Sequence, residues 1–250
     1  MTTSLKKGDG TFPTTEWTLV ARLRNKDAGV SARALDDLCT QYHYPLYCFI
    51  RQRGLPHHDA QDALHDFFAK LLRLEAFEDM EQEKGRLRTF LAKSLQRFLI
   101  TRHQQESRRA ERELSVDCTR FALDPKLEQR YQRELAASHH APDVVFDRQW
   151  CEQLLQRVLL RLQADYQKRK KLPVFTTLRP VLLSGGSLRG HDAAQLAATL
   201  TMTEPALRTA LLRLLRDYRT LLEDEVLQTV TSKDEVEAEI AQLMNSLRRD

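Results

Sequence analysis

The chain has 250 residues, of which 42% are hydrophobic and 30% charged, and its formal net charge at pH 7 is +4. This composition is ordinary for a globular protein that buries one large core or two small ones. No apolar run approaches the roughly 18 residues of a membrane-spanning helix, the N-terminus lacks an apolar signal segment, and the four cysteines form no C-x-x-C pair. We therefore expect a cytoplasmic protein with reduced thiols and no membrane contact.

The first half of the chain shows helical periodicity. Residues 1–12 are expected to be a disordered tail, and apolar residues then recur at helical spacing over residues 31–53. Gly54 and Pro56 break the pattern, which starts again over residues 57–73. With only eight glycines and eight prolines and no convincing strand, the fold is predicted to be all-α.

The segment 57–73 has an apolar face and a polar face. The apolar arc contains Ala60, Leu64, Phe67, Phe68 and Leu71, and the opposite arc contains His58, Asp59, Asp62, His65 and Asp66. Three interpretations of the polar arc follow: a solvated surface, a docking face, or a metal site that would make the protein a hydrolase. The metal site would use His57, His58, Asp62, His65 and Asp66, but one helix face supplies few ligands, and no His-Glu-x-x-His motif is present.

Charge is segregated along the sequence. Residues 55–83 hold eight acidic and two basic residues, whereas 84–112 hold nine basic and two acidic ones. Residues 222–239 are again acidic, with seven acids against Lys233. Solvated helix faces would explain these blocks, and so would two partners on adjoining surfaces, one of them a polyanion. In the basic helix expected from about 87 to 113, Phe90 and Phe98 could stack on bases, although most of its apolar residues fit a core stripe.

The second half begins after a loss of periodicity. We predict a linker over 113–147 and a second helical domain over 148–230. Residues 193–218 fit a helix-turn-helix, with Thr203 capping the second helix and Pro205 in its first turn. The last segment, 231–250, is an acidic amphipathic helix. Either it packs on its own domain, or it covers a basic DNA-binding face.

At this point the sequence resembles bacterial RNA polymerase sigma factors of the extracytoplasmic-function (ECF) type, over roughly 13–112 and 146–230. YPLYCFIRQRG and DAQDALHDFF resemble the polymerase-binding part of sigma region 2, whose pattern is close to DAEDLVQETF. EKGRLRTFLAKSLQRFL resembles the part that melts and reads the −10 element. AAQLAATLTMTEPALRTALLRLLRDY resembles region 4, which reads the −35 element. TTEWTLV, FDRQWCEQLLQRVLLRL and EDEVLQTV resemble an ECF subgroup with a longer C-terminal half.

The resemblance implies three sets of site residues. The polymerase-binding face would contain Asp59, Asp62, His65 and Asp66. The −10 surface would contain Arg86, Arg88, Phe90, Lys93, Gln96, Arg97 and Arg102. The −35 surface would contain Thr203, Arg208, Thr209, Leu212, Arg213 and Arg216.

The sequence also departs from the family pattern. Leu87 replaces a Phe of the −10 part, and Thr201 replaces the Gly of the helix-turn-helix turn. Leu212 and Leu215 occupy positions where polar or basic residues are common. If Thr201 requires a positive φ, its β-branched side chain costs roughly 1 kcal/mol or more.

The resemblance implies a sigma factor of two helical domains, 13–112 and 148–230, that is not an enzyme and needs no cofactor. Its partners would be core RNA polymerase and promoter DNA, both duplex and melted. The resemblance leaves open whether an anti-sigma factor is a further partner. No Walker-type glycine-rich loop is present in the sequence. The alternatives are a stand-alone helix-turn-helix regulator, which would bind DNA without polymerase, and the metal-dependent hydrolase.

Overall fold

The computed structural model describes residues 22–23, 25, 27–73, 87–110, 125–135, 140–227, 229–230 and 233–248. The regular elements in these ranges are all helices, which confirms the all-α prediction. They are α2 (Ala28–Gln52), α3 (His57–Arg73), α4 (Leu87–Ala110), α5 (Pro125–Leu135), α6 (Pro142–Lys168), α7 (Leu172–Leu183), α8 (Ala193–Thr199), α9 (Glu204–Leu227), a short 3₁₀ helix (Lys233–Glu235) and α10 (Val236–Arg248). Within the described ranges, no helix combines the length and apolarity that crossing a membrane requires.

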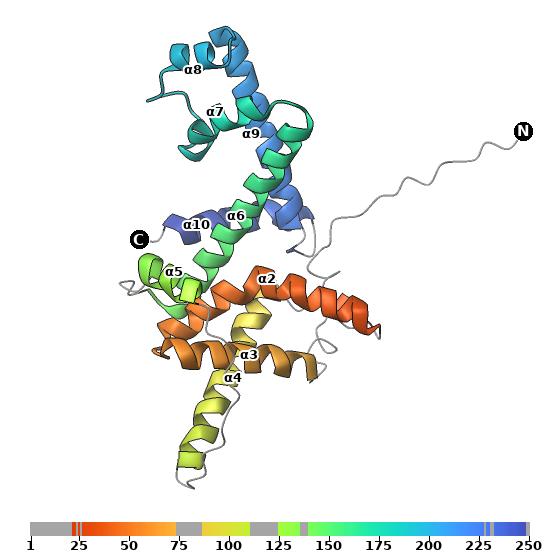
Figure 1. Ribbon diagram of the computed structural model, residues 1–250, viewed down its shortest axis with the longest axis vertical. Helices are drawn as coiled ribbons and strands as arrows, with labels where there is room; N and C mark the ends of the chain where they lie inside the picture. The colour runs from red at the N-terminus through yellow and green to blue at the C-terminus, as the bar shows by residue number, and fades with distance from the viewer. Residues whose placement is uncertain are drawn as a thin grey trace, which may run out of the picture.

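The N-terminal part is built from α2, α3 and α4. Helix α2 begins at the cap Asp27, whose side chain accepts hydrogen bonds from the backbone N–H groups of Gly29 and Val30. It ends before Gly54, which has a φ of +91° and lets the chain turn into α3. The helical periodicity predicted over residues 31–53 agrees with the complete burial of Leu38, Tyr42, Leu46, Phe49 and Ile50 on one side of α2. Figure 1 shows α4 leaving this group and projecting away from the rest of the molecule.

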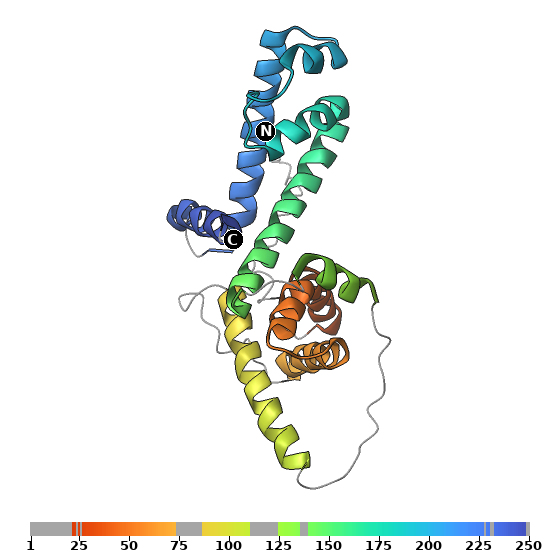
Figure 2. The ribbon, with the colours of Figure 1, turned by 90° about the vertical axis from the view of Figure 1, so that its left-hand side faces the viewer.

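Two long helices, α6 and α9, run side by side and connect two hydrophobic cores (Figures 1 and 2). One core contains buried residues of α2 to α5, the first turns of α6, the end of α9, and α10. The other contains the end of α6, α7, α8 and the first turns of α9. Along α6, Val158 belongs to the first core and Leu162 to the second. The two cores therefore meet inside continuous helices.

This arrangement differs from the predicted division into domains 13–112 and 148–230 with a linker at 113–147. Helix α5 lies inside the predicted linker, and its Leu127, Tyr131 and Leu135 are buried in the first core. These residues recur every four positions, so they form one apolar stripe on a short, otherwise charged helix. Helix α6 begins at Pro142 and packs on α2, because its first turns are apolar toward that helix. The predicted tail at 1–12 lies outside the described residues.

Helix α10 packs on α6 and α9 where the two halves meet. Val236 and Leu243 are buried, and Ile240, Met244 and Leu247 are half-buried against the first core. The amphipathic helix expected within 231–250 is therefore present and lies against its own chain. Of the two acids in α10, Glu237 is exposed and Glu239 is buried.

Candidate functional surfaces

The outer side of α3 is an acidic face, defined here as Asp59, Asp62, His65 and Asp66. Asp59 and Asp66 are exposed, whereas Asp62 and His65 are half-buried. The Nδ1 atom of His58 lies 3.0 Å from Asp62, and Asp66 pairs with Arg102 of α4 at 3.1 Å. The opposite arc is buried as predicted, at Ala60, Leu64, Phe67, Phe68 and Leu71. The acidic face therefore points away from the core and borders the basic helix α4.

The five residues of the metal hypothesis do not converge on one point. His57 faces inward, where its Nδ1 lies 2.8 Å from the hydroxyl of Tyr47, while His58 turns toward Asp62. The ring of His65 lies 6.3 Å from that of His43, centroid to centroid. Within the described ranges no group of three or more histidine, cysteine, aspartate or glutamate side chains could hold a metal ion. The arrangement of these side chains on α3 therefore does not support the metal site of the hydrolase alternative.

The outer side of α4 is a basic face, defined here as Lys93, Gln96 and Arg97. Lys93 and Arg97 are exposed and Gln96 is half-buried, so the three side chains form one patch along the helix. Arg102 lies further along, half-buried beside Asp66. Phe90 is half-buried against the first core, in keeping with a core stripe. Arg86, also predicted for this surface, lies outside the described residues.

A hollow of about 200 Å³ opens between α3 and α4, beside the basic face. Its lining is Phe67, Lys70, Leu71, Ser94, Arg97, Phe98 and Thr101. The Lys70 ammonium lies 5.5 Å from the centre of the Phe98 ring. An apolar, aromatic floor with cations beside it suits a planar group next to an anion, such as an unstacked base next to its phosphate. Lys70, Ser94 and Thr101 were not predicted, because periodicity along one helix does not reveal what faces it from another.

Arg88 does not join the basic face. It is 3% exposed and pairs with Asp147 of α6 and with Glu239 of α10, the latter at 2.9 Å. Its guanidinium lies 5.2 Å from the centre of the Trp150 ring. The first turn of α4 enters the junction between the halves, where Leu87 is also buried, so this side chain meets acids of the same chain. The expectation that Arg88 faces DNA is therefore not met in this conformation.

Helices α8 and α9 lie in the segment predicted as a helix-turn-helix and are joined by a short turn at residues 200–203. Asp192 caps α8 by accepting from the N–H of Gln195 at 2.9 Å, and the Thr203 hydroxyl oxygen lies 3.4 Å from the N–H of Ala206. Thr201 has a φ of +54°, the left-handed conformation that favours glycine. These caps and this turn set the angle between the two helices.

The N-terminal half of α9 is divided into an inner and an outer side. Leu207, Leu211 and Leu214 are buried, and Leu215 is half-buried. The predicted −35 residues are all exposed: Thr203, Arg208, Thr209, Leu212, Arg213 and Arg216. Leu212 is 68% exposed, although leucine is normally buried. This outer side, called the α9 face, combines three cations, two hydroxyls and one aliphatic group.

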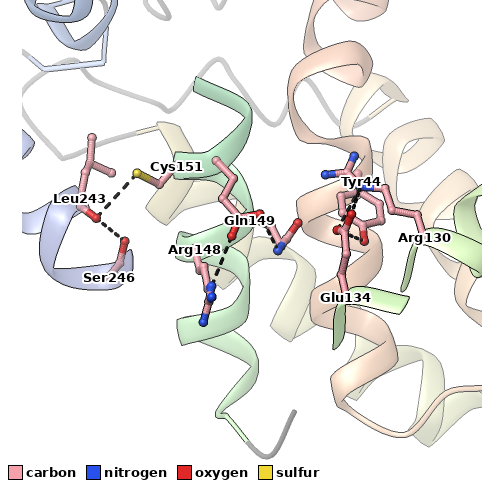
Figure 3. Close-up of polar contacts among 9 residues, drawn as sticks. Tyr44, Arg130, Glu134, Arg148, Gln149, Cys151, Leu243 and Ser246 are labelled. Atoms are coloured by element: carbon pink, nitrogen blue, oxygen red, sulfur yellow. Dashed lines mark hydrogen bonds and ion pairs between the residues drawn. The ribbon is translucent and has the colours of Figure 1, made fainter. Parts of the chain in front are cut away.

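A network of tyrosines and acids joins α5 to α2. Tyr44 donates to Glu134 at 2.9 Å, and Arg130 lies 3.6 Å from the centre of the Tyr44 ring (Figure 3). Tyr47 donates to Glu128 at 2.5 Å. Burial, and then the hydrogen bond to Glu128, raise the pKa of Tyr47 well above its ordinary value. Tyr47 therefore stays protonated as a donor, and the network attaches a helix instead of activating a nucleophile.

Comparisons with protein-family models, with curated proteins and with solved structures find no match for this chain. A proposal about its function therefore starts from the acidic face of α3, the basic face and hollow at α4, and the α9 face.

Proposed function

We propose that this chain is a sigma factor of the ECF type, which binds core RNA polymerase and directs it to particular promoters. The observation that carries the proposal is the α9 face, in which all six predicted −35 residues point outward from a helix-turn-helix. The same chain also presents an acidic helix face beside a basic one, in the order that the sequence resemblance implies. None of the three surfaces requires a cofactor.

The α9 face supplies what duplex reading needs. The second helix of a helix-turn-helix lies in the major groove, with its first turns against the base edges. Arg208, Arg213 and Arg216 would contact phosphates or guanines, and Thr209 and Leu212 would meet bases. Because the inner leucines fix α9 against α8 and α7, these side chains approach DNA on a rigid scaffold.

The basic face and the hollow would serve the melted strand. Lys93 and Arg97 would neutralise phosphates, and the hollow beside Phe98 would take a base that has left the duplex. Its position between two packed helices keeps the pocket walls in place. The free energy for melting would come from such contacts together with those of the polymerase.

The acidic face of α3 would dock on polymerase. We would test this by co-elution of the purified protein with bacterial core RNA polymerase on a sizing column, beside the double variant Asp62→Arg/Asp66→Arg. A matched control is Asp234→Arg/Glu235→Arg, which reverses two exposed acids elsewhere. Wild type and control should co-elute and the α3 variant should not. No co-elution of wild type at micromolar concentration would reject the sigma function. If duplex binding then remained, the open α9 face would favour the stand-alone regulator.

A further inference from the structure

Helix α10 lies at the junction between the two halves. It packs on α6 and α9, and through Glu239 it reaches the first turn of α4. Figure 2 shows it crossing beside the lower part of α9, and Figure 3 shows Cys151 of α6 turned toward Leu243 of α10. The Cys151 thiol lies 3.7 Å from the carbonyl oxygen of Leu243. Helix α10 therefore does more than pack on the domain that precedes it, because it also contacts α4, which carries the proposed −10 surface.

The contact between α10 and α4 is a buried ion pair. Glu239 is 0% exposed and Arg88 3%, with Glu239 Oε1 at 2.9 Å from Arg88 Nη2. A carboxylate removed from water in this way requires a cation beside it, since burying a single charge is costly. Asp147 occupies the other side of the guanidinium, and its side chain is 36% exposed. Removing α10 would leave Arg88 with Asp147 at the edge of the solvent.

Arg88, in the first turn of α4, is closed to DNA by this arrangement. It is 3% exposed, and both of its ion-pair partners are acids of the same chain. The α9 face, by contrast, carries three exposed arginines. The two proposed DNA surfaces thus differ in charge and in access within one chain.

We propose that α10 is an autoinhibitory helix: through Glu239 it keeps Arg88 from the melted strand until polymerase or another partner displaces it. This inference rests on the proposed function and adds its regulation. A protein whose competent form is a small fraction of the total binds with an affinity lowered by that fraction. The free chain should therefore bind single-stranded DNA weakly, and weakening the α10 contact should strengthen that binding.

The central variant is Glu239→Gln, which keeps the side-chain volume and removes the charge. The matched control is Glu237→Gln, the same change on the same helix. Its side chain is 86% exposed and lies 3.5 Å from Arg219 of α9, an exposed pair that contributes little to the seat of α10. A second variant, Leu243→Ala, weakens the apolar seat of α10 while leaving both charges of the ion pair. If α10 is an inhibitor, Glu239→Gln and Leu243→Ala should act alike, although one removes a charge and the other removes apolar contact.

Cys151 reports release of α10 in the unmodified chain. Burial raises its pKa to about 12, so little reactive thiolate exists while α10 covers it. Modification of the peptide containing Cys151 by a thiol reagent, followed by mass spectrometry, should be at least tenfold faster in Glu239→Gln and in Leu243→Ala. The loss of one partner of a buried ion pair shifts an equilibrium by at least this much. Glu237→Gln should match wild type.

DNA binding decides between an inhibitor and a purely structural helix. The probe is a random-sequence single strand of roughly 15 nucleotides, the scale of one single-strand site. If α10 is an inhibitor, Glu239→Gln and Leu243→Ala should bind this single strand about tenfold more tightly than wild type, and Glu237→Gln should bind it with the wild-type affinity. Faster thiol modification without tighter binding would overturn it, as would unchanged modification. Loss of the cooperative thermal transition in either variant would also overturn it, because α10 would then be part of the fold.

Co-elution with core polymerase separates this inference from the function on which it depends. If wild type binds polymerase through the acidic face but Glu239→Gln gains no single-strand affinity, only the autoinhibition is wrong. If wild type does not co-elute with polymerase and also does not bind DNA when polymerase is present, both the sigma function and the autoinhibition are wrong.

Discussion

The α9 face and the first turn of α4 were both expected to contact DNA, yet the first is exposed to solvent and Arg88 in the second is buried. Arg213 and Arg216 of α9 are exposed, whereas Arg88 of α4 is 3% exposed between two acids. Both helices are amphipathic, so the difference does not come from either helix alone. It comes from α6 and α10, which cover one surface and leave the other open. Residue type therefore indicates what a side chain could bind, and long-range packing determines whether it is accessible.

The largest expected effect concerns the two cores that carry these surfaces. Trp150 is fully buried in the first core and Phe175 in the second, at 2% exposure. Replacing either with alanine should lower the free energy of unfolding by about 3–5 kcal/mol. Since α6 and α9 pass through both cores, each variant should still unfold in urea as a single transition, followed by circular dichroism. Two separate transitions, with Trp150→Ala moving only one, would show that the covered and open surfaces belong to independent units.

The next effect distinguishes the two surfaces by the DNA they contact. Arg213→Gln/Arg216→Gln should weaken duplex binding roughly tenfold and reduce the slope of log K against log salt by about 0.9 for each lost phosphate contact. Lys93→Gln/Arg97→Gln should leave duplex binding unchanged and reduce the single-strand slope by about 0.7 per contact. Both are measured by fluorescence anisotropy with the polymerase complex.

The control for this pair of variants is Arg219→Gln, since Arg219 already pairs with Glu223 at 2.6 Å. Its duplex affinity should be close to that of wild type. If each double variant lost affinity for duplex and single-stranded DNA equally, the α4 and α9 surfaces would bind one continuous DNA site and not two separate ones.

A smaller effect should come from Leu212 of the α9 face. Its 68% exposed side chain lies between the arginines and suits the methyl group of a thymine. Replacing thymine by deoxyuridine at the contacted position of a selected duplex removes that methyl, at a cost of roughly 0.8 kcal/mol, or about fourfold in affinity. Leu212→Ala should bind both duplexes equally. If wild type also shows no difference at any thymine, Leu212 does not read bases.

Elements whose pattern is local could be predicted from the sequence. Helix α3 was expected at 57–73 and is found there, because Gly54 and Pro56 stop α2 and the apolar arc has a clear period. The resemblance implied the outward residues of α9, and the helical spacing of its leucines agrees with that side being exposed. Both cases depend on information within about 20 residues of the chain, which is the length of one helix.

Contacts between distant segments could not be predicted in this way. Arg88 and Glu239 lie far apart in the sequence, and no periodicity shows that α10 crosses the start of α4. The hollow depends on Lys70 of one helix facing Phe98 of another. Helix α5 was missed because its apolar stripe has only three buried residues among charged ones. The ion pair covers Arg88, and the hollow brings together side chains of two helices, so the surroundings of these site residues depend on contacts beyond one helix.

The smallest effect tests one turn that could be foreseen. Thr201 holds a φ of +54° between α8 and α9, where a β-branched residue is strained and glycine is not. Thr201→Gly should relieve about 1 kcal/mol of strain and lose part of that to the greater freedom of glycine in the unfolded chain, for a net gain of roughly 0.5 kcal/mol. The control is Thr199→Gly in α8, where helical geometry makes glycine unfavourable by about 0.5 kcal/mol. Opposite signs of the two stability changes in thermal unfolding would confirm the strain. Because the turn sets the angle of α9, a more stable fold with unchanged duplex affinity would show that DNA binding by the α9 face does not depend on this strain.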